Sequence, residues 1–342
     1  MQYIMKALVK LGAGKDQVKL MDVPEPKSKE NYILVNVKAA GICGSDLLIR
    51  EDKHPYEAPV ILGHEFAGVL NESKSGWREG ERVTSQTTFS TCGRCYLCKS
   101  GNPQLCPEKK VIGVKADGAF TSKIVVPISG LHKIPPNISF EEASITEIGA
   151  DVVYALNERA NVQPGSFVAI FGCGPVGIFA TQIAKASGAE LAIIGTKTER
   201  DEHRLSIAEK LGADHILYAE EDPAKEIKEL TNGNGADITM EASGSPIACV
   251  QALKATRNLG KVIAFGIPKG EVTIPWNELI FTGIEIIFHL SSTWTSWEKM
   301  LKLMEMGVVK TKPMIKTYKL EEWERAFEEF AHGEVVKVVL IP

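Results

Sequence analysis

Four residues, from three distant parts of the chain, are of types that bind zinc in catalytic sites. They are Cys43, His64, Glu65 and Glu147. A thiolate, an imidazole and one or two carboxylates can hold Zn²⁺ and leave one position open for water or substrate. Each residue also has a structural explanation, because a free cysteine often packs in a core and a lone histidine beside a glutamate is usually structural. The combination favours a catalytic zinc site.

The run 41–46 (GICGSD) gives Cys43 a suitable setting. Its glycines permit a tight turn that points the thiol inward. Asp46 is expected to be the hydrogen-bond partner of a ligating histidine. It can also act as the N-cap of a helix that begins at Leu47.

Four further cysteines predict a second, structural zinc site. The spacing is C-x2-C-x2-C-x7-C, formed by Cys92, Cys95, Cys98 and Cys106. Four thiolates complete a tetrahedral shell and leave no open position, which is typical of a zinc that folds a loop. Disulfides and an iron–sulfur cluster are the alternatives. A nucleic-acid zinc module is disfavoured because few basic residues surround the cysteines.

A glycine-rich run between a predicted strand and a predicted helix indicates a dinucleotide site. Residues 166–171 (SFVAIF) are typical of a buried strand, and residues 178–187 predict a helix. Between them lies G-x-G-x-x-G, in which the glycines form the turn, admit the pyrophosphate and let helix and strand pack closely. The helix N-terminus then faces the phosphates. The expected contacts are Gly172, Gly174, Pro175, Val176 and Gly177.

The end of the next predicted strand favours NADP(H) over NAD(H). An NAD site usually places a carboxylate there for the ribose 2′-hydroxyl. Residues 195–200 read GTKTER, so Thr196, Lys197 and Arg200 are predicted to bind a 2′-phosphate. The alternative is that these cations are solvated and that Glu199 or Asp201 turns inward to bind NAD.

The remaining pattern predicts an α/β protein with two domains. Residues 1–40 and 111–135 predict short strands, and residues 140–148 predict a helix capped by Ser139. Six strands alternate with helices between 166 and 288, as in a Rossmann doubly wound dinucleotide-binding domain. The tail predicts helices at 297–306 and 320–332 and a strand at 335–341 that returns to the first domain. The expected domains are 1–150 with 291–342, for catalysis, and 151–290, for the dinucleotide.

The bulk composition is that of an ordinary globular protein. The chain has 342 residues, 44% of them hydrophobic, and a net charge of −4. Without a basic run, a nucleic acid or a membrane surface is not an expected partner. The first residues lack the apolar core of a signal peptide, so we expect a cytoplasmic protein whose cysteines bind metal.

Together, these motifs resemble the zinc-containing medium-chain dehydrogenase/reductase superfamily along essentially the whole chain. The resemblance implies a GroES-like β-barrel catalytic domain beside the Rossmann domain. It is strongest to the sorbitol (polyol) and L-threonine dehydrogenase branch, which has a glutamate at Glu147 where other members have a cysteine. It implies a catalytic zinc held by Cys43, His64 and Glu65 or Glu147, which can exchange during turnover.

The resemblance also implies a reaction. Zinc lowers the pKa of a substrate alcohol, and hydride passes from its carbinol carbon to the nicotinamide. Ser45 matches the hydroxyl residue that accepts the substrate proton. The family often has a histidine three residues later, where this chain has Leu48, so we expect the proton to leave through Glu147 or a water chain. Glu65 is a further candidate for that role.

The expected substrate is a polyol, a sugar or a related secondary alcohol. A threonine-type amino alcohol is the alternative within the enzyme class, and a non-catalytic binding protein on the same fold is the alternative outside it. The family also implies a homo-oligomer, a dimer or a tetramer. The β-rich segment 284–288 would allow pairing of strand edges between subunits.

Overall fold

The computed structural model describes residues 3–342, which form two compact units. One, called unit 1 here, contains the described residues up to Glu147 together with Thr293–Glu305 and Met314–Pro342. The other, unit 2, contains Ile148–Ser292 and Met306–Pro313. No helix within residues 3–342 is long and apolar enough to cross a membrane.

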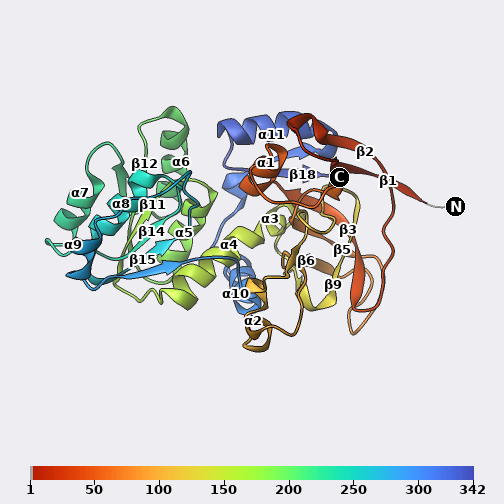
Figure 1. Ribbon diagram of the computed structural model, residues 1–342, viewed down its shortest axis with the longest axis horizontal. Helices are drawn as coiled ribbons and strands as arrows, with labels where there is room; N and C mark the ends of the chain where they lie inside the picture. Colours follow the sequence, from red (N-terminus) through yellow and green to blue (C-terminus); the bar gives the residue numbers. More distant parts are fainter. Residues whose placement is uncertain (1–2) are drawn as a thin grey trace. The chain divides into compact units, whose positions relative to one another are not determined.

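Unit 1 is built mainly from antiparallel strands (Figure 1). Its larger sheet has the order β10-β6-β5-β3-β18-β17, with β9 also paired to β3, and a smaller sheet has the order β2-β1-β4. The strands are β1 (Ile4–Lys10), β2 (Val18–Pro24), β3 (Tyr32–Gly41), β4 (Val60–Ile61), β5 (Glu65–Leu70), β6 (Arg82–Ser85), β7 (Thr88–Ser90), β8 (Lys110–Val111), β9 (Lys123–Pro127), β10 (Leu131–Lys133), β17 (Ile315–Lys319) and β18 (Lys337–Ile341). The helices are α1 (Gly44–Arg50), α2 (Tyr96–Lys99), α3 (Phe140–Ser144), α10 (Trp294–Glu305) and α11 (Trp323–His332).

The return of the C-terminal strand to the first part of the chain is confirmed. Strand β18 pairs antiparallel with β3, so that Leu340 lies opposite Ala40, and it also pairs in parallel with β17. Residues 337–340 of β18 are buried, as expected for a strand inside a sheet. The pairing brings Lys337 near the segment that leads from β3 into α1.

Unit 2 contains the predicted doubly wound sheet. Its six strands are all parallel, in the order β13-β12-β11-β14-β15-β16. They are β11 (Phe167–Phe171), β12 (Glu190–Gly195), β13 (His215–Tyr218), β14 (Ala236–Glu241), β15 (Thr256–Ala264) and β16 (Glu285–Phe288). The helices are α5 (Pro175–Ala186), α6 (Glu199–Lys210), α7 (Pro223–Leu230), α8 (Pro246–Ala255) and α9 (Trp276–Ile280), preceded by α4 (Thr146–Val153) and a π-helix (Tyr154–Arg159).

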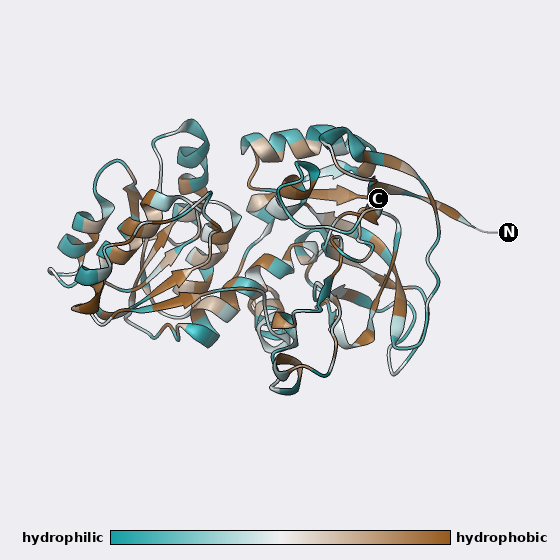
Figure 2. Cartoon of the chain, viewed as in Figure 1, coloured by the Kyte–Doolittle hydropathy of each residue, from teal (hydrophilic) through white to brown (hydrophobic). Residues whose placement is uncertain are grey.

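The polarity of the strands explains this layering. All five residues of β11 are apolar and buried, which is typical of a strand covered on both faces. In Figure 2 the strands of unit 2 are mostly brown, whereas teal residues gather on the helices. This order of strands reverses between β11 and β14, the position where doubly wound sheets bind their ligands.

Three local predictions are corrected. The helix predicted at 140–148 is broken at Ile145 into α3 and α4, because the side chains of Ser144 and Thr146 donate to nearby backbone carbonyls. The N-cap Ser139 is confirmed. The strand expected at 111–114 ends at Val111 in a tight turn. Cys43, not Asp46, occupies the N-cap of α1.

Candidate catalytic zinc site and dinucleotide site

The pairing of β3 with β5 brings the first three candidate zinc ligands together. Glu65 begins β5 opposite Gly41, the last residue of β3, and Cys43 follows two residues after Gly41. One donor atom each from Cys43, His64 and Glu65 lies within 4.8 Å of the others. His64 and Glu65 are buried and Cys43 is half-buried, so the three donors form one largely buried cluster in unit 1.

Gly41 leaves room for the carboxylate of Glu65. A Cβ atom at Gly41 would lie only 2.6 Å from Oε2 of Glu65, which is closer than carbon and oxygen can approach. No described residue forms a hydrogen bond with this Oε2 atom, although it is buried. A buried carboxylate oxygen without a partner is uncommon, and it is a ready ligand for a cation.

The other oxygen of Glu65 is bound by a lysine that the sequence analysis did not identify. Lys337 Nζ lies 2.6 Å from Glu65 Oε1 and donates to the carbonyl of Ile42 at 2.7 Å. Burial lowers the pKa of Lys337, but Glu65, Cys43 and Glu147 together raise it. Lys337 is therefore charged, and it binds one of the two carboxylate oxygens of Glu65.

Asp46 lies beside His64 but does not form the hydrogen bond that the sequence predicts, because neither its Oδ1 atom nor Nδ1 of His64 has a hydrogen-bond partner among residues 3–342. Its Oδ2 atom accepts from the backbone N–H of Cys43 at 2.8 Å, and its Oδ1 atom lies 3.9 Å from Nδ1 of His64. Burial raises the pKa of Asp46. Burial acts to lower the pKa of His64, but Cys43, Asp46 and Glu147 raise it well above its ordinary value.

The acidic groups around His64 would be neutralised by a divalent cation. The acidic groups of Cys43, Asp46 and Glu147 act on His64, and Glu65 adds a further carboxylate that is balanced by Lys337. Burying this surplus of negative charge is unfavourable unless a cation neutralises it. Sulfur, imidazole nitrogen and carboxylate oxygen are the donors that zinc takes. The donor set therefore fits Zn²⁺.

The last two candidate catalytic residues lie at the ends of helices. Ser45 is half-buried in the first turn of α1, two residues after Cys43. Glu147 is half-buried in the first turn of α4 and lies outside the three-donor group. Its charge nevertheless acts on both His64 and Lys337, so its carboxylate lies near this site.

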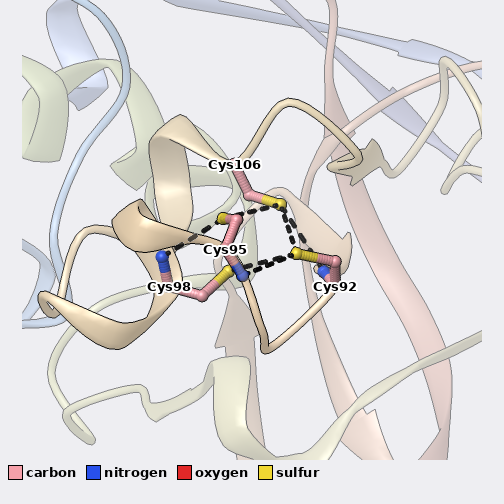
Figure 3. Close-up of side chains that lie close together, drawn as sticks. All are labelled: Cys92, Cys95, Cys98 and Cys106. Atoms are coloured by element: carbon pink, nitrogen blue, oxygen red, sulfur yellow. Dashed lines mark hydrogen bonds between the residues drawn. The ribbon is translucent and has the colours of Figure 1, made fainter.

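The four cysteines of the second site converge (Figure 3). The Sγ–Sγ distances include 3.6 Å between Cys106 and Cys92, 3.9 Å between Cys95 and Cys106, and 4.0 Å between Cys92 and Cys98. Thiolates at the corners of a zinc tetrahedron lie about 3.8 Å apart, whereas a disulfide requires about 2 Å. Backbone N–H groups, those of Arg94 and Cys95 among them, lower the pKa of Cys92 to about 7. The arrangement fits a closed zinc shell.

The glycine-rich loop has the form that a dinucleotide requires. Gly172 has φ +117°, and a Cβ there would lie 2.9 Å from the backbone nitrogen of Ser243. At Gly177 a Cβ would lie 1.9 Å from the Gly172 carbonyl oxygen, so helix and strand meet too closely for a side chain. Gly174, the N-cap of α5, has no atom within 4 Å of such a position and leaves space for a phosphate. Pro175 and Val176 form the first turn of α5.

The candidate 2′-phosphate contacts at the end of β12 are engaged with neighbouring carboxylates. Thr196 donates through its backbone N–H and its hydroxyl to Oδ2 of Asp201, at 3.0 and 2.6 Å. The other carboxylate oxygen of Asp201 accepts from Arg200 at 3.1 Å, and Asp201 is buried. Burial alone would raise the pKa of Asp201, but Thr196 and Arg200 lower it. Lys197 pairs with Glu221 on the surface.

Two cations near these sites were missed by the sequence analysis. Arg204, one helical turn after Arg200, is largely buried, and among the described residues nothing accepts a hydrogen bond from its Nε atom. A basic pair at i and i+4 on the helix after the strand was the available signal. For Lys337, the signal was a single charge inside the otherwise apolar strand predicted at 335–341.

Comparisons with known proteins agree with this geometry. Residues 29–136 match the alcohol dehydrogenase GroES-like domain, and residues 175–306 match the zinc-binding dehydrogenase family. A sorbitol dehydrogenase of Halalkalibacterium halodurans is 34% identical, with 99% of each chain covered. An L-threonine 3-dehydrogenase of Bacillus licheniformis is 35% identical, again with 99% of each chain covered.

A solved structure extends the likeness to the whole fold. A protein of Sinorhizobium meliloti, described as a zinc-binding dehydrogenase and bound to NADP, superimposes with a TM-score of 0.91 at 26% identity over 100% of both chains. The protein is thus an oxidoreductase that uses zinc and a nicotinamide cofactor to interconvert an alcohol and its carbonyl product. The chain belongs to the zinc-dependent medium-chain dehydrogenase/reductase superfamily, in the branch of the sorbitol (polyol) and L-threonine dehydrogenases.

Proposed function

We propose that the protein oxidises a secondary hydroxyl group of a polyol or sugar, with NADP as the preferred oxidant. The observation that carries this proposal is the buried group of Cys43, His64 and Glu65, with the charge of Glu147 acting on it. A zinc ion held there supplies the Lewis acidity that lowers the pKa of the substrate hydroxyl. In this proposal residues 1–150 and 291–342 form the catalytic domain, and residues 151–290 form the cofactor domain.

Glu65 and His64 each have two atoms that could bind the metal. We assign the ligand atom of each residue as the one that does not face a neighbouring side chain. Lys337 fixes Oε1 of Glu65, which leaves Oε2 as the available ligand atom. Asp46 lies beside Nδ1 of His64, so the opposite ring nitrogen is the one left for the metal. Glu147 is the carboxylate proposed to exchange with Glu65 during turnover.

Proton release follows from the residues around Cys43. Ser45 accepts the proton of the substrate hydroxyl, in the first turn of α1. Leu48 cannot pass the proton on, because its side chain has no titratable group. We assign that step to Glu147 or a water chain. If Glu147→Gln leaves both the zinc content and the turnover rate unchanged, this assignment is wrong.

The preference for NADP is supported by the state of Asp201. Both of its carboxylate oxygens are engaged, by Thr196 and by Arg200, and the group is buried. It therefore does not offer a carboxylate to a ribose hydroxyl in the way that NAD sites do. Thr196, Lys197 and Arg200 are the proposed contacts of the 2′-phosphate, and Arg204 adds a nearby positive charge.

We also propose a homo-oligomer that forms along β16. This strand is an edge of the sheet in unit 2, and exposed edges favour pairing with another chain. Large apolar side chains are exposed on nearby segments, among them Trp276, Phe281 and Phe288, which are 67%, 87% and 77% exposed. In light scattering, Phe281→Lys is expected to lower the mass of the assembly. Ile247→Lys, a matched change of an exposed residue on α8, is expected to leave it unchanged.

The substrate class is tested by initial rates of NADP and NAD reduction with sugar alcohols, aldoses, L-threonine and simple alcohols. Turnover of a polyol or sugar is the expected result. L-threonine as the only good substrate would favour the second candidate, which the similarity to an L-threonine 3-dehydrogenase supports. No turnover of any alcohol by fully zinc-loaded protein would contradict both.

A further inference from the structure

The side chain of His289, the residue after β16, has no hydrogen-bond partner in the described part of the chain. Both of its ring nitrogens are buried, and neither contacts a hydrogen-bonding atom of residues 3–342. The ring is held on one side by Phe265, parallel to it at 4.6 Å between centroids and 10° between planes. Tyr154 lies against it at 5.6 Å, and the His289 backbone N–H donates to the carbonyl of Ala264.

The imidazole is neutral. Burial and the nearby charge of Arg159 lower the pKa of His289 to about 4. A neutral imidazole carries one N–H donor and one nitrogen that accepts. Buried polar groups almost always have a partner in the protein, in water or in a ligand. The contacts with Phe265 and Tyr154 hold the imidazole ring in one orientation, and this fixes the positions of its two nitrogens.

The place of His289 in the sheet identifies the ligand. In a doubly wound sheet of this order the dinucleotide lies across the carboxyl ends of the strands, with its pyrophosphate at the loop after the first strand. The adenosine half lies over β12, where the ribose-binding residues stand. The second half of the sheet, β14 to β16, is left for the nicotinamide half. Phe265 and His289 directly follow the ends of β15 and β16.

We propose that His289 is a positioning residue for the nicotinamide ring, and that one of its ring nitrogens accepts a hydrogen bond from the carboxamide NH₂ of the oxidised cofactor. The positive charge of the oxidised ring makes this NH₂ a strong donor. A neutral imidazole accepts from it, whereas an imidazolium would repel it. The proposal rests on the use of a nicotinamide cofactor, and it does not depend on which substrate or which ribose the enzyme prefers.

The test measures binding, not turnover. Isothermal titration of zinc-loaded protein compares NADP, or NAD if it binds more tightly, with the corresponding 3-acetylpyridine dinucleotide, in which a methyl group replaces the NH₂. Wild-type protein is expected to bind the natural cofactor about 10-fold more tightly, as for one hydrogen bond. In His289→Leu the preference is expected to fall below about 2-fold. His289→Gln, which keeps an acceptor, is expected to retain part of it.

A matched control uses the histidine at the opposite end of the sheet. His215 begins β13, and its Nε2 pairs with Glu190 at 2.9 Å. His215→Leu is expected to keep the full preference. An equal loss of affinity for both dinucleotides in His289→Leu would overturn the proposal, because it indicates a structural role only. An unchanged preference would overturn it as well. If wild-type protein binds no nicotinamide dinucleotide, the proposal fails together with the function on which it rests.

Discussion

Lys337 Nζ lies 2.6 Å from Oε1 of Glu65, and both side chains are completely buried. The two residues are 272 positions apart in the sequence. They meet because β18 pairs with β3, which in turn pairs with β5. The ion pair therefore ties the C-terminal strand to the proposed catalytic zinc site.

Replacing Lys337 by Met is expected to destabilise the protein by about 3–5 kcal/mol, because it leaves the Glu65 carboxylate buried without its partner. Urea unfolding measures this change. Lys316→Met is the matched control, since Lys316 on the neighbouring strand pairs with Glu329 at 2.5 Å but is half exposed. Its expected cost is much smaller, because water screens an ion pair at the surface. Similar losses in the two variants would contradict the role given to the buried pair.

Zinc analysis is expected to give two ions per chain. Cys43→Ala and Cys98→Ser are each expected to retain one, because the two donor groups share no residue. Loss of the Cys98 site removes the ion that folds the loop around α2, so faster proteolysis of residues 92–106 is expected in that variant alone. One ion per chain in wild-type protein, or both ions retained in either variant, would refute the two-site assignment.

Charge removal at the end of β12 tests the cofactor preference. Arg200→Ala and Lys197→Ala are each expected to lower kcat/KM for NADP roughly 10- to 100-fold, as for a lost charge-assisted hydrogen bond. The value for NAD is expected to change little. Lys185→Ala, which removes a lysine paired with Asp214, serves as the control. Equal effects on both cofactors would show that these cations do not bind a 2′-phosphate.

The neutral state of His289 predicts a specific acid sensitivity. Its pKa is about 4 in the folded protein and has an ordinary value of 6.5. A depressed folded pKa contributes stability that is fully present above pH 6.5 and is lost as the pH falls toward 4. The expected loss is about 2–3 kcal/mol. In urea unfolding at pH 7 and pH 4, His289→Gln should lose that much less stability than wild-type protein. Identical losses would show that His289 is not buried in its neutral form.

Much of the fold could be predicted because the sequence patterns that specify its strands and its glycine-rich loop each lie within a few consecutive residues. Continuous apolar runs identified the buried strands of unit 2, and β11 begins one residue after the start of the predicted run 166–171. The glycine-rich loop was identified because its requirements are steric and lie within six residues. The break at Ile145 was not predicted, since it depends on hydroxyl groups that bond to the backbone.

The ligands were easier to identify than the residues that hold them. Cys43, His64 and Glu65 are of types that bind metal, and their spacing carries information. Lys337 has no such spacing, because its partner is set by the order of strands in a sheet. His289 is similar, since its importance depends on which strand end it follows and on the absence of a described partner for its ring.

The dependence of alcohol oxidation on Cys43 is tested by the rate of NADP reduction with the best polyol or sugar, in wild-type protein and in Cys43→Ala. Both proteins are purified in the presence of zinc, and both are shown by titration to bind the cofactor. Ready turnover is expected in wild-type protein and a loss of at least about 1,000-fold in the variant, because Lewis-acid activation of the hydroxyl is removed. Undiminished turnover by Cys43→Ala would show that alcohol oxidation does not depend on zinc bound by Cys43.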